Sequence, residues 1–125
     1  MVPDGFGDMA AEAYELYKDS KPAWEGGFQA LVRTSSASDP VTDSAAAATA
    51  YATGVKTNNG SIAVDVDGNP LVSLLTLAHG AGKAAGIVST DVVTGATPAA
   101  FAASDEDRDL SEQKRRQALD YPKSL

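Results

Sequence analysis

The 125-residue sequence contains no cysteine and a single histidine, His79. The lack of cysteine excludes disulfide bonds, thiol nucleophiles and thiolate-ligated zinc, although it does not assign a cellular compartment. The scarcity of histidine is as restrictive, because most catalytic zinc sites and most serine triads need a well-placed imidazole. No apolar run approaches the roughly 20 residues of a membrane-spanning helix, and the first residues lack the basic-then-apolar pattern of a signal peptide. We therefore expect a chain without a membrane span.

Basic side chains are also few: 10 lysines and arginines stand against 17 aspartates and glutamates, a formal net charge of -7. This balance argues against a groove for nucleic acid and against attraction to an anionic membrane. Any phosphate group that the protein binds must be held locally, by a few placed donors or by a metal ion. The content of 43% hydrophobic and 22% charged residues is typical of a folded globular domain.

Five segments have the apolar spacing, the alanine content or the capping residues of helices. They cover residues 8–18, 41–56, 71–83, 99–104 and, as a charged tail, 105–121. The strongest pattern is that of residues 41–56, where Thr42 and Asp43 stand at the cap position, a run of alanines follows, and Gly54 lies near the end. The sequence thus predicts several helices of ordinary length.

Two β-branched runs, residues 28–34 and 84–93, predict buried strands, and the alternating residues 61–66, between turn dipeptides at 59–60 and 67–68, predict a small hairpin. A helix, a glycine exit and a β-branched run form the second half of a βαβ unit, so we expect an α/β fold with a parallel sheet. Three strands at most would leave both faces of such a sheet poorly covered. The sequence therefore predicts part of a larger domain.

Two patterns that are reminiscent of functional sites have simpler explanations. Asp65, Asp67 and Asn69 begin like a calcium loop, but Pro70 occupies the position of its obligatory glycine, which predicts a turn instead. His79 ends an apolar helix, where an imidazole is stabilised by the helix dipole, and this explanation is favoured over metal ligation.

One constellation carries chemistry: the segment VTDSAAAATAYATG places Asp43 and Ser44 at the start of a helix. Unpaired backbone N–H groups and the helix dipole favour an anion there, so this is a candidate phosphate site with Ser44 as its nucleophile. The local pattern alone favours the alternative that Asp43 or Ser44 is simply an N-cap. A nucleophilic serine also needs activation, either by His79 brought close in space or by a divalent metal ion.

Three motifs together resemble the alkaline phosphatase family. They are PDGFG, VTDSAAAATAYATGVKTNNG, and GIVSTDVVTGATPAAFAAS followed by Arg108, so the resemblance runs from Asp4 to Arg108. It implies an α/β three-layer sandwich, with a mostly parallel sheet and helices on both faces, that is incomplete in this chain. Residues 1–125 would form the N-terminal portion of a single domain, with a charged helical tail over residues 108–125.

The resemblance implies a role for five residues. Ser44 matches the serine that attacks phosphorus and forms a phosphoserine, and Arg108, with Asp43 beside Ser44, matches the group that binds the substrate phosphate. Asp4, Ser44 and Thr97 match metal ligands, and the implied metals are zinc and magnesium. These assignments suit the chemistry, because a planar guanidinium binds two phosphate oxygens and magnesium prefers oxygen ligands.

Taken singly, three of these residues have simpler alternatives. Asp4 could be a turn residue, Thr97 could cap the helix that follows it, and Arg108 could form a surface ion pair with Asp105 or Glu112.

The sequence also departs from the family. Gly95 stands where the family usually has an aspartate or histidine near magnesium, and the other zinc and magnesium ligands come from a later part of the family's chain. We therefore expect hydrolysis of phosphate monoesters in the full-length enzyme but not by these residues alone.

Two alternative functions stay open. The first is a non-catalytic remnant that binds phosphate or metal, and the second, less favoured, is a related phosphodiesterase or sulfatase-like hydrolase. By family resemblance the protein would be periplasmic or extracellular, with a homodimer possible, and no nucleic-acid partner is expected.

Overall fold

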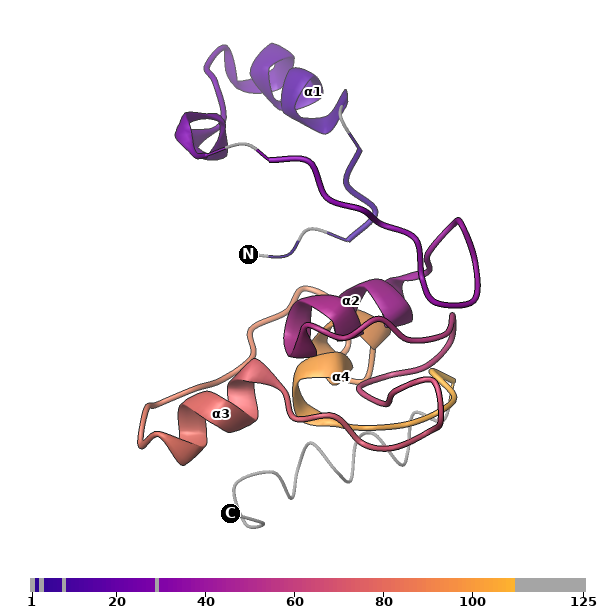
Figure 1. Cartoon of the computed structure of the whole chain (residues 1–125). Helices are drawn as coiled ribbons and strands as arrows, with labels where there is room; N and C mark the ends of the chain where they lie inside the picture. Colours follow the sequence, from indigo (N-terminus) through magenta and orange to yellow (C-terminus); the bar gives the residue numbers. More distant parts are fainter. Residues whose placement is uncertain (1, 3, 8, 29, 110–125) are drawn as a thin grey trace. The chain divides into compact units, whose positions relative to one another are not determined.

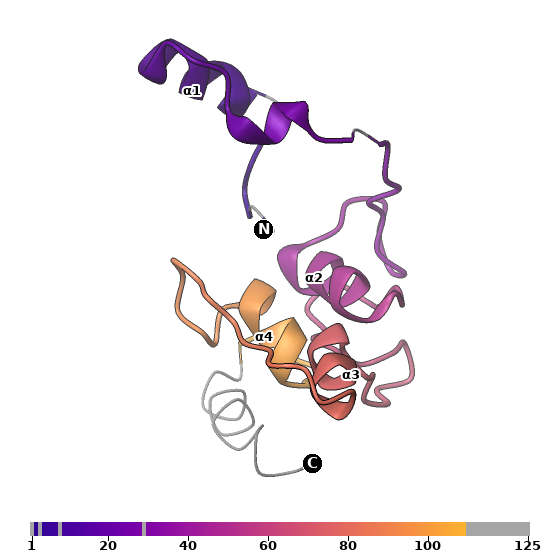
Figure 2. The same cartoon turned by 90° about the vertical axis from the view of Figure 1, so that its left-hand side faces the viewer.

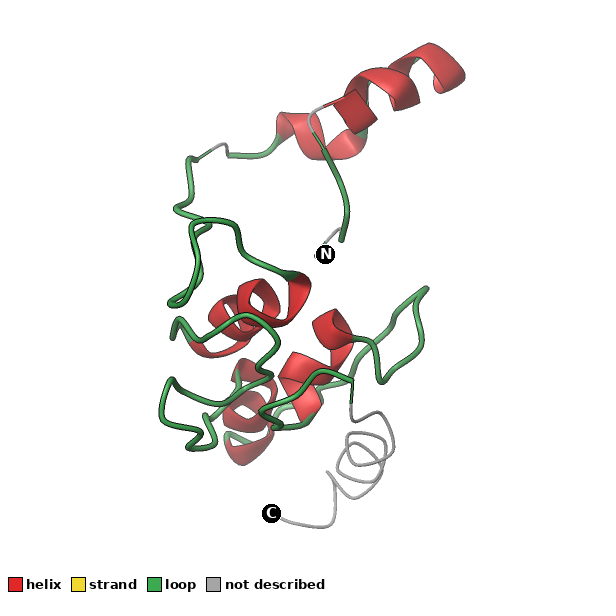
Figure 3. Ribbon diagram, turned by 90° about the vertical axis from the view of Figure 1, so that its right-hand side faces the viewer, coloured by secondary structure: helices red, strands yellow, loops and turns green. Residues whose placement is uncertain are grey.

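The computed structural model describes residues 2, 4–7, 9–28 and 30–109. The chain divides into two compact units, Met1–Arg33 and Thr34–Leu125. The described residues form helices joined by loops, with no strand among them (Figure 3). None of the described helices is both long enough and apolar enough to cross a bilayer. The expected charged tail lies outside the described residues from position 110 onward, and Arg108 itself lies in a turn.

The first unit contains α1 (Met9–Lys18), which confirms the helix expected over residues 8–18. It also contains η1, a short 3-10 helix (Ala23–Gly26) that the sequence analysis did not predict. The ring of Trp24 packs against Phe6 at 5.7 Å and against Tyr14 at 5.5 Å between centroids. None of the residues of α1 is buried, so this helix has no apolar core around it. The aromatic contacts of Trp24 connect α1 to the other segments of the unit.

The second unit contains α2 (Ser44–Thr53), α3 (Leu74–Gly80) and α4 (Ala96–Ala102), which two views show gathered into one body (Figures 1 and 2). All three helices were expected. Gly54 ends α2 with a φ of 78°, a left-handed conformation that glycine adopts without steric cost. The start of α4 differs from the expectation, because Gly95 is its cap residue and Thr97 lies inside its first turn.

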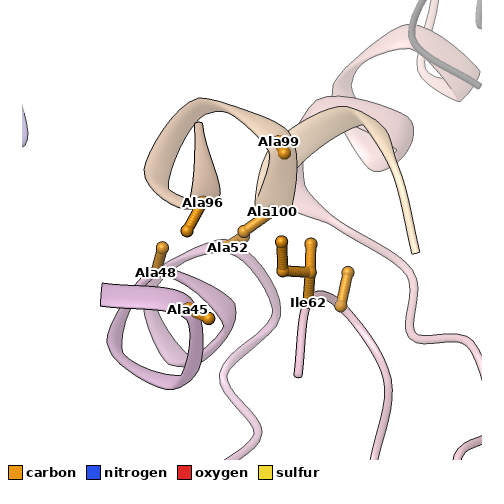
Figure 4. Close-up of a cluster of buried hydrophobic side chains, with 8 residues drawn as sticks. Ala45, Ala48, Ala52, Ile62, Ala96, Ala99 and Ala100 are labelled. Atoms are coloured by element: carbon orange, nitrogen blue, oxygen red, sulfur yellow. The ribbon is translucent and has the colours of Figure 1, made fainter. Parts of the chain in front are cut away.

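The core of the second unit is made almost entirely of alanine. Three alanines of α2 face three alanines of α4, with one larger side chain from the loop between α2 and α3 beside them (Figure 4). These residues are Ala45, Ala48, Ala52, Ala96, Ala99, Ala100 and Ile62. Because no alanine side chain extends beyond Cβ, the backbones of the two helices can approach closely. The alanine run predicted a helix, and the structure adds that it is a helix interface.

Buried hydroxyl groups connect this core to the loops around it. The Thr49 hydroxyl oxygen accepts a hydrogen bond from the backbone N–H of Ala63 at 2.8 Å, and the Ser73 hydroxyl donates to the backbone carbonyl of Phe101 at 2.7 Å. Both hydroxyls are buried, and hydrogen bonds of buried polar groups are costly to break. These bonds position the start of α3 and the segment around Ala63 against α2 and α4.

The expected strands are not formed among the described residues. Phe28 and Leu31 in one segment and Val88 in the other are fully exposed, whereas the sequence analysis predicted burial. A strand is stable only when a neighbouring strand takes up its backbone hydrogen bonds, and no such neighbour is present in the described part of the chain. The expected hairpin is reduced to one antiparallel bridge between Val64 and Pro70. The parallel sheet therefore stays a prediction.

Candidate active site

Asp43 and Ser44 lie at the first turn of α2, as expected. The Asp43 carboxylate accepts a hydrogen bond from the backbone N–H of Ala46, with 2.9 Å between nitrogen and Oδ1. This is the geometry of an N-cap, so that alternative is confirmed for Asp43. Ser44 is the first residue of the helix and is half-buried. The cap therefore fixes the backbone that carries the candidate nucleophile.

Arg108 lies beside this helix start. Its Nη1 donates a hydrogen bond to Oδ2 of Asp43 at 3.1 Å, although the two residues are 65 positions apart in the sequence. The side chains are 36% and 25% exposed, so the pair is more shielded from water than an ordinary surface ion pair. Among the described residues, Arg108 thus pairs with Asp43. The expected alternative was a surface pair with Asp105 or Glu112. Glu112 lies outside the described residues.

The surroundings of Asp43 keep its carboxyl group ionised. Partial burial by itself raises the pKa of Asp43, because burial penalises the charged form. Hydrogen bonds from the N–H groups of Ala46 and Gly60 and from the guanidinium of Arg108 outweigh this effect, so the pKa lies below its ordinary value of 3.8. At neutral pH the carboxylate is therefore charged and can hold the guanidinium.

A short backbone pairing brings Arg108 to this place. The backbone N–H of Ile62 donates to the carbonyl of Asp105 at 2.7 Å, and the N–H of Asp105 donates back at 2.8 Å. The N–H of Arg108 then donates to the carbonyl of Gly60 at 2.8 Å. The sequence predicts residues 59–60 only as a turn, and their contact with Asp43 and Arg108 was not predicted. Their place within the motif that contains Ser44 was the one available signal.

Thr97 is the second residue of α4 and is half-buried. Its neighbour Ala96 and the neighbour of Ser44, Ala45, belong to the same alanine core (Figure 4). The structure therefore brings the helices that carry Ser44 and Thr97 into contact.

Asp4 and His79 take positions typical of turn and helix-end residues. Asp4 is exposed in a bend beside Gly5, whose φ is 66°, and it belongs to the first unit. Its role as a metal ligand stays a prediction. His79 is exposed in the last turn of α3, in agreement with the expected position at a helix end.

The space beside Gly95 is filled by a carboxylate. A Cβ atom on Gly95 would clash with Oδ2 of Asp91, far inside van der Waals contact. Asp91 also accepts a hydrogen bond from the N–H of Val92 through Oδ1 at 2.7 Å. Asp91 therefore supplies an acidic group close to position 95, where this chain has glycine instead of the aspartate or histidine that is usual in the family. The described residues contain no group of three histidine, cysteine, aspartate or glutamate side chains close enough to share a metal ion.

Comparison with known proteins identifies one family. The family model described as alkaline phosphatase matches residues 1–123. Alkaline phosphatase 3 of Bacillus subtilis is 41% identical over 117 residues, which cover 86% of this chain and 25% of that protein. The human tissue-nonspecific isozyme of alkaline phosphatase is 42% identical over 92 residues, or 66% of this chain and 18% of that protein. The chain spans about a quarter of the length of the curated relatives that it matches first.

Solved structures agree with the sequence comparison. The alkaline phosphatase of the Antarctic bacterium TAB5 superposes with a TM-score of 0.85 at 33% identity, over 94% of this chain and 35% of that one. The enzyme of Thermus thermophilus gives a TM-score of 0.84 at 38% identity, over 96% of this chain and 27% of that one. The fold is therefore alkaline-phosphatase-like, and the chain belongs to the alkaline phosphatase family.

Proposed function

We propose that the full-length protein hydrolyses phosphate monoesters at the start of α2, with Ser44 as nucleophile and Arg108 as the phosphate-binding group. The observation that carries the proposal is the ion pair between Arg108 and Asp43, the residue before Ser44. The pair supports the proposal because Asp43, which holds the guanidinium, immediately precedes the serine at the first turn of α2. Family membership supports the same reaction class.

Arg108 can bind phosphate without leaving Asp43. A guanidinium carries five N–H donors in one plane, and the contact with Asp43 uses Nη1. The other nitrogens can donate to two phosphate oxygens in the bidentate geometry that arginine favours. Asp43 thus fixes the orientation of the guanidinium plane, and Arg108 binds and orients the phosphate for attack from Ser44.

Ser44 performs the chemical step. Its Oγ forms a bond to phosphorus while the bond from phosphorus to the substrate alcohol breaks, and the alcohol leaves with a proton. Water then attacks the phosphorus of the phosphoserine, and the bond from phosphorus to Oγ breaks. Inorganic phosphate is released, and Oγ takes a proton from the attacking water, which replaces the proton that Ser44 gave to the alcohol. Arg108 stabilises the charge on the phosphate oxygens in both steps.

The donor set fits magnesium in part. Magnesium prefers oxygen ligands, keeps several waters and needs only one or two carboxylates, so Ser44, Thr97 and Asp91 of the second unit offer suitable atoms. A bound divalent cation would lower the pKa of a coordinated hydroxyl and offset phosphate charge. Zinc does not fit these residues alone, because the chain has one imidazole and no thiol, and the described residues hold no three-residue cluster of metal-ligating side chains.

Turnover of an aromatic phosphate monoester by the full-length, metal-loaded protein tests the proposal. We expect Ser44→Ala to lower kcat by at least about a thousandfold, because the attacking oxygen is removed. Ser20→Ala is the matched control, because Ser20 is exposed in the first unit, and it should keep normal kcat. Unchanged turnover in Ser44→Ala would contradict the proposal. Phosphate binding without any turnover by the unmodified protein would favour the non-catalytic alternative.

A further inference from the structure

The turn at Asn59 and Gly60 contacts the segment before Ser44. The backbone N–H of Asp43 donates to Oδ1 of Asn59 at 3.1 Å, and Nδ2 of Asn59 donates to the carbonyl of Val41 at 3.0 Å. Both ends of the Asn59 amide are therefore bonded to residues 41–43. The N–H of Gly60 donates to Oδ2 of Asp43 at 2.9 Å, so the same turn holds both the backbone and the carboxylate of Asp43.

The same turn also holds the segment that carries Arg108. The carbonyl of Gly60 accepts the backbone N–H of Arg108 at 2.8 Å. The Gly60 residue therefore donates to Asp43 on one side and accepts from Arg108 on the other. Its φ of 88° is in the left-handed region that glycine favours. The turn is itself anchored, because the N–H of Asn59 donates to the Ser38 hydroxyl oxygen at 3.0 Å.

These contacts converge on one atom, Oδ2 of the Asp43 carboxylate. It accepts hydrogen bonds from the backbone N–H of Gly60 and from the guanidinium of Arg108. Its direction depends on the backbone of residue 43, which is held by its hydrogen bond to Asn59. The Arg108 side chain is one-third exposed and has many rotamers, and within the described part of the chain its orientation depends on this acceptor.

From this geometry we infer that Asn59 is a positioning residue for phosphate recognition, acting through Asp43 on the guanidinium of Arg108. The inference rests on the proposed function, because it assigns Asn59 to the same phosphate site. Asn59 contacts no phosphate itself. Its amide keeps residues 41–43 in the conformation that aims Oδ2 at the guanidinium, so Arg108 is oriented before phosphate arrives and loses less freedom on binding.

The dissociation constant for inorganic phosphate, measured by isothermal titration calorimetry on the full-length, metal-loaded protein, tests this inference. We expect Asn59→Ala to raise the constant about tenfold, because both hydrogen bonds of the amide are lost. Asn69→Ala is the matched control, because the Asn69 amide donates to Asp65 in a different turn, and it should bind phosphate normally. Circular dichroism at the titration temperature gives the folded fraction of each variant, and the apparent dissociation constant is corrected by that fraction, so loss of stability alone is not counted as weaker binding.

A second comparison separates positioning from a general structural role. In the Arg108→Ala background, adding Asn59→Ala should cause no further weakening, because the group that Asn59 positions is already absent. The inference is overturned if Asn59→Ala binds phosphate like Asn69→Ala, or if its effect stays tenfold without Arg108. If the unmodified protein binds no phosphate, the proposed function and the inference both fail, whereas the other two outcomes overturn the inference alone.

Discussion

Asp43 combines two structural roles through its two carboxylate oxygens. Oδ1 caps α2 through the N–H of Ala46, and Oδ2 binds the N–H of Gly60 and the guanidinium of Arg108. A helix cap and a partly shielded ion pair each contribute on the order of 1 kcal/mol to stability. Folding of the helix and placement of Arg108, the proposed phosphate-binding group, are therefore coupled at one side chain.

The lowered pKa of Asp43 predicts how stability depends on pH. A carboxyl group whose pKa is lower in the folded state stabilises the protein above its unfolded pKa, here the ordinary value of 3.8, and loses this effect as pH falls through the folded pKa. We expect the free energy of unfolding to exceed that of Asp43→Asn by about 1 kcal/mol above roughly pH 5, and the difference to shrink below about pH 4. Denaturant unfolding from pH 3 to 7 measures it.

The comparison with Asp43→Asn removes the contribution of other carboxyl groups. Asp65 also has a lowered pKa, caused first by its hydrogen bonds with Asn69, and it titrates equally in both proteins. A difference that stays constant down to pH 3 would show that the charge of Asp43 does not stabilise the fold.

Local chemistry explains which residues could be predicted. Asp43 and Ser44 were placed at a helix start because capping depends on residues that are close in sequence. The partner of Arg108 was not predictable from the residues, because 65 positions separate it from Asp43 and many acidic residues compete for it. Asn59 was missed for the same reason, since a turn dipeptide does not indicate what its amide will bind.

At the scale of helices, the contact between α2 and α4 depends on small side chains. Ala52 and Ala100 are fully buried, so the space between the helices has no room for a longer side chain. We expect Ala52→Leu to lower the free energy of unfolding by about 1–3 kcal/mol, because the added carbons force the helices apart. Thermal and denaturant unfolding of the full-length protein would measure this loss.

Ala47→Leu is the matched control for this experiment. Ala47 lies on the same helix but outside the buried core, and leucine has nearly the helix propensity of alanine. We expect a change within about 0.5 kcal/mol. Equal effects of the two substitutions would show that close approach of α2 and α4 does not stabilise the fold.

The segments that were predicted as strands show the limit of what the spacing of apolar residues can predict. The β-branched runs over residues 28–34 and 84–93 indicate which side chains avoid water, but not which strand pairs with them. In the described structure these segments stay unpaired, and Val88 is fully exposed. The helices were predictable because their backbone hydrogen bonds close within the segment, whereas a sheet needs a partner elsewhere.

At the scale of the whole molecule, three segments of the second unit that are distant in sequence, residues 41–44, 59–62 and 105–108, meet beside the start of α2. The pairing of residues 60–62 with residues 105–108 joins two of them to the start of α2. The match to alkaline phosphatases covers nearly the whole chain and about a quarter of the curated relatives. The family was predictable because its three motifs occur in order, while the contacts between the second and third motifs required the structure.

Acid quenching of the full-length, metal-loaded protein during turnover of a phosphate monoester, followed by peptide mass spectrometry, tests whether Ser44 is the nucleophile of a phosphate site at the start of α2. Phosphoserine is stable in acid, so a covalent intermediate would be retained. We expect a phosphoryl group on the peptide that contains Ser44, and none on that peptide in Ser44→Ala. Turnover with the phosphoryl group on a different residue, or with no covalent phosphate at all, would contradict it.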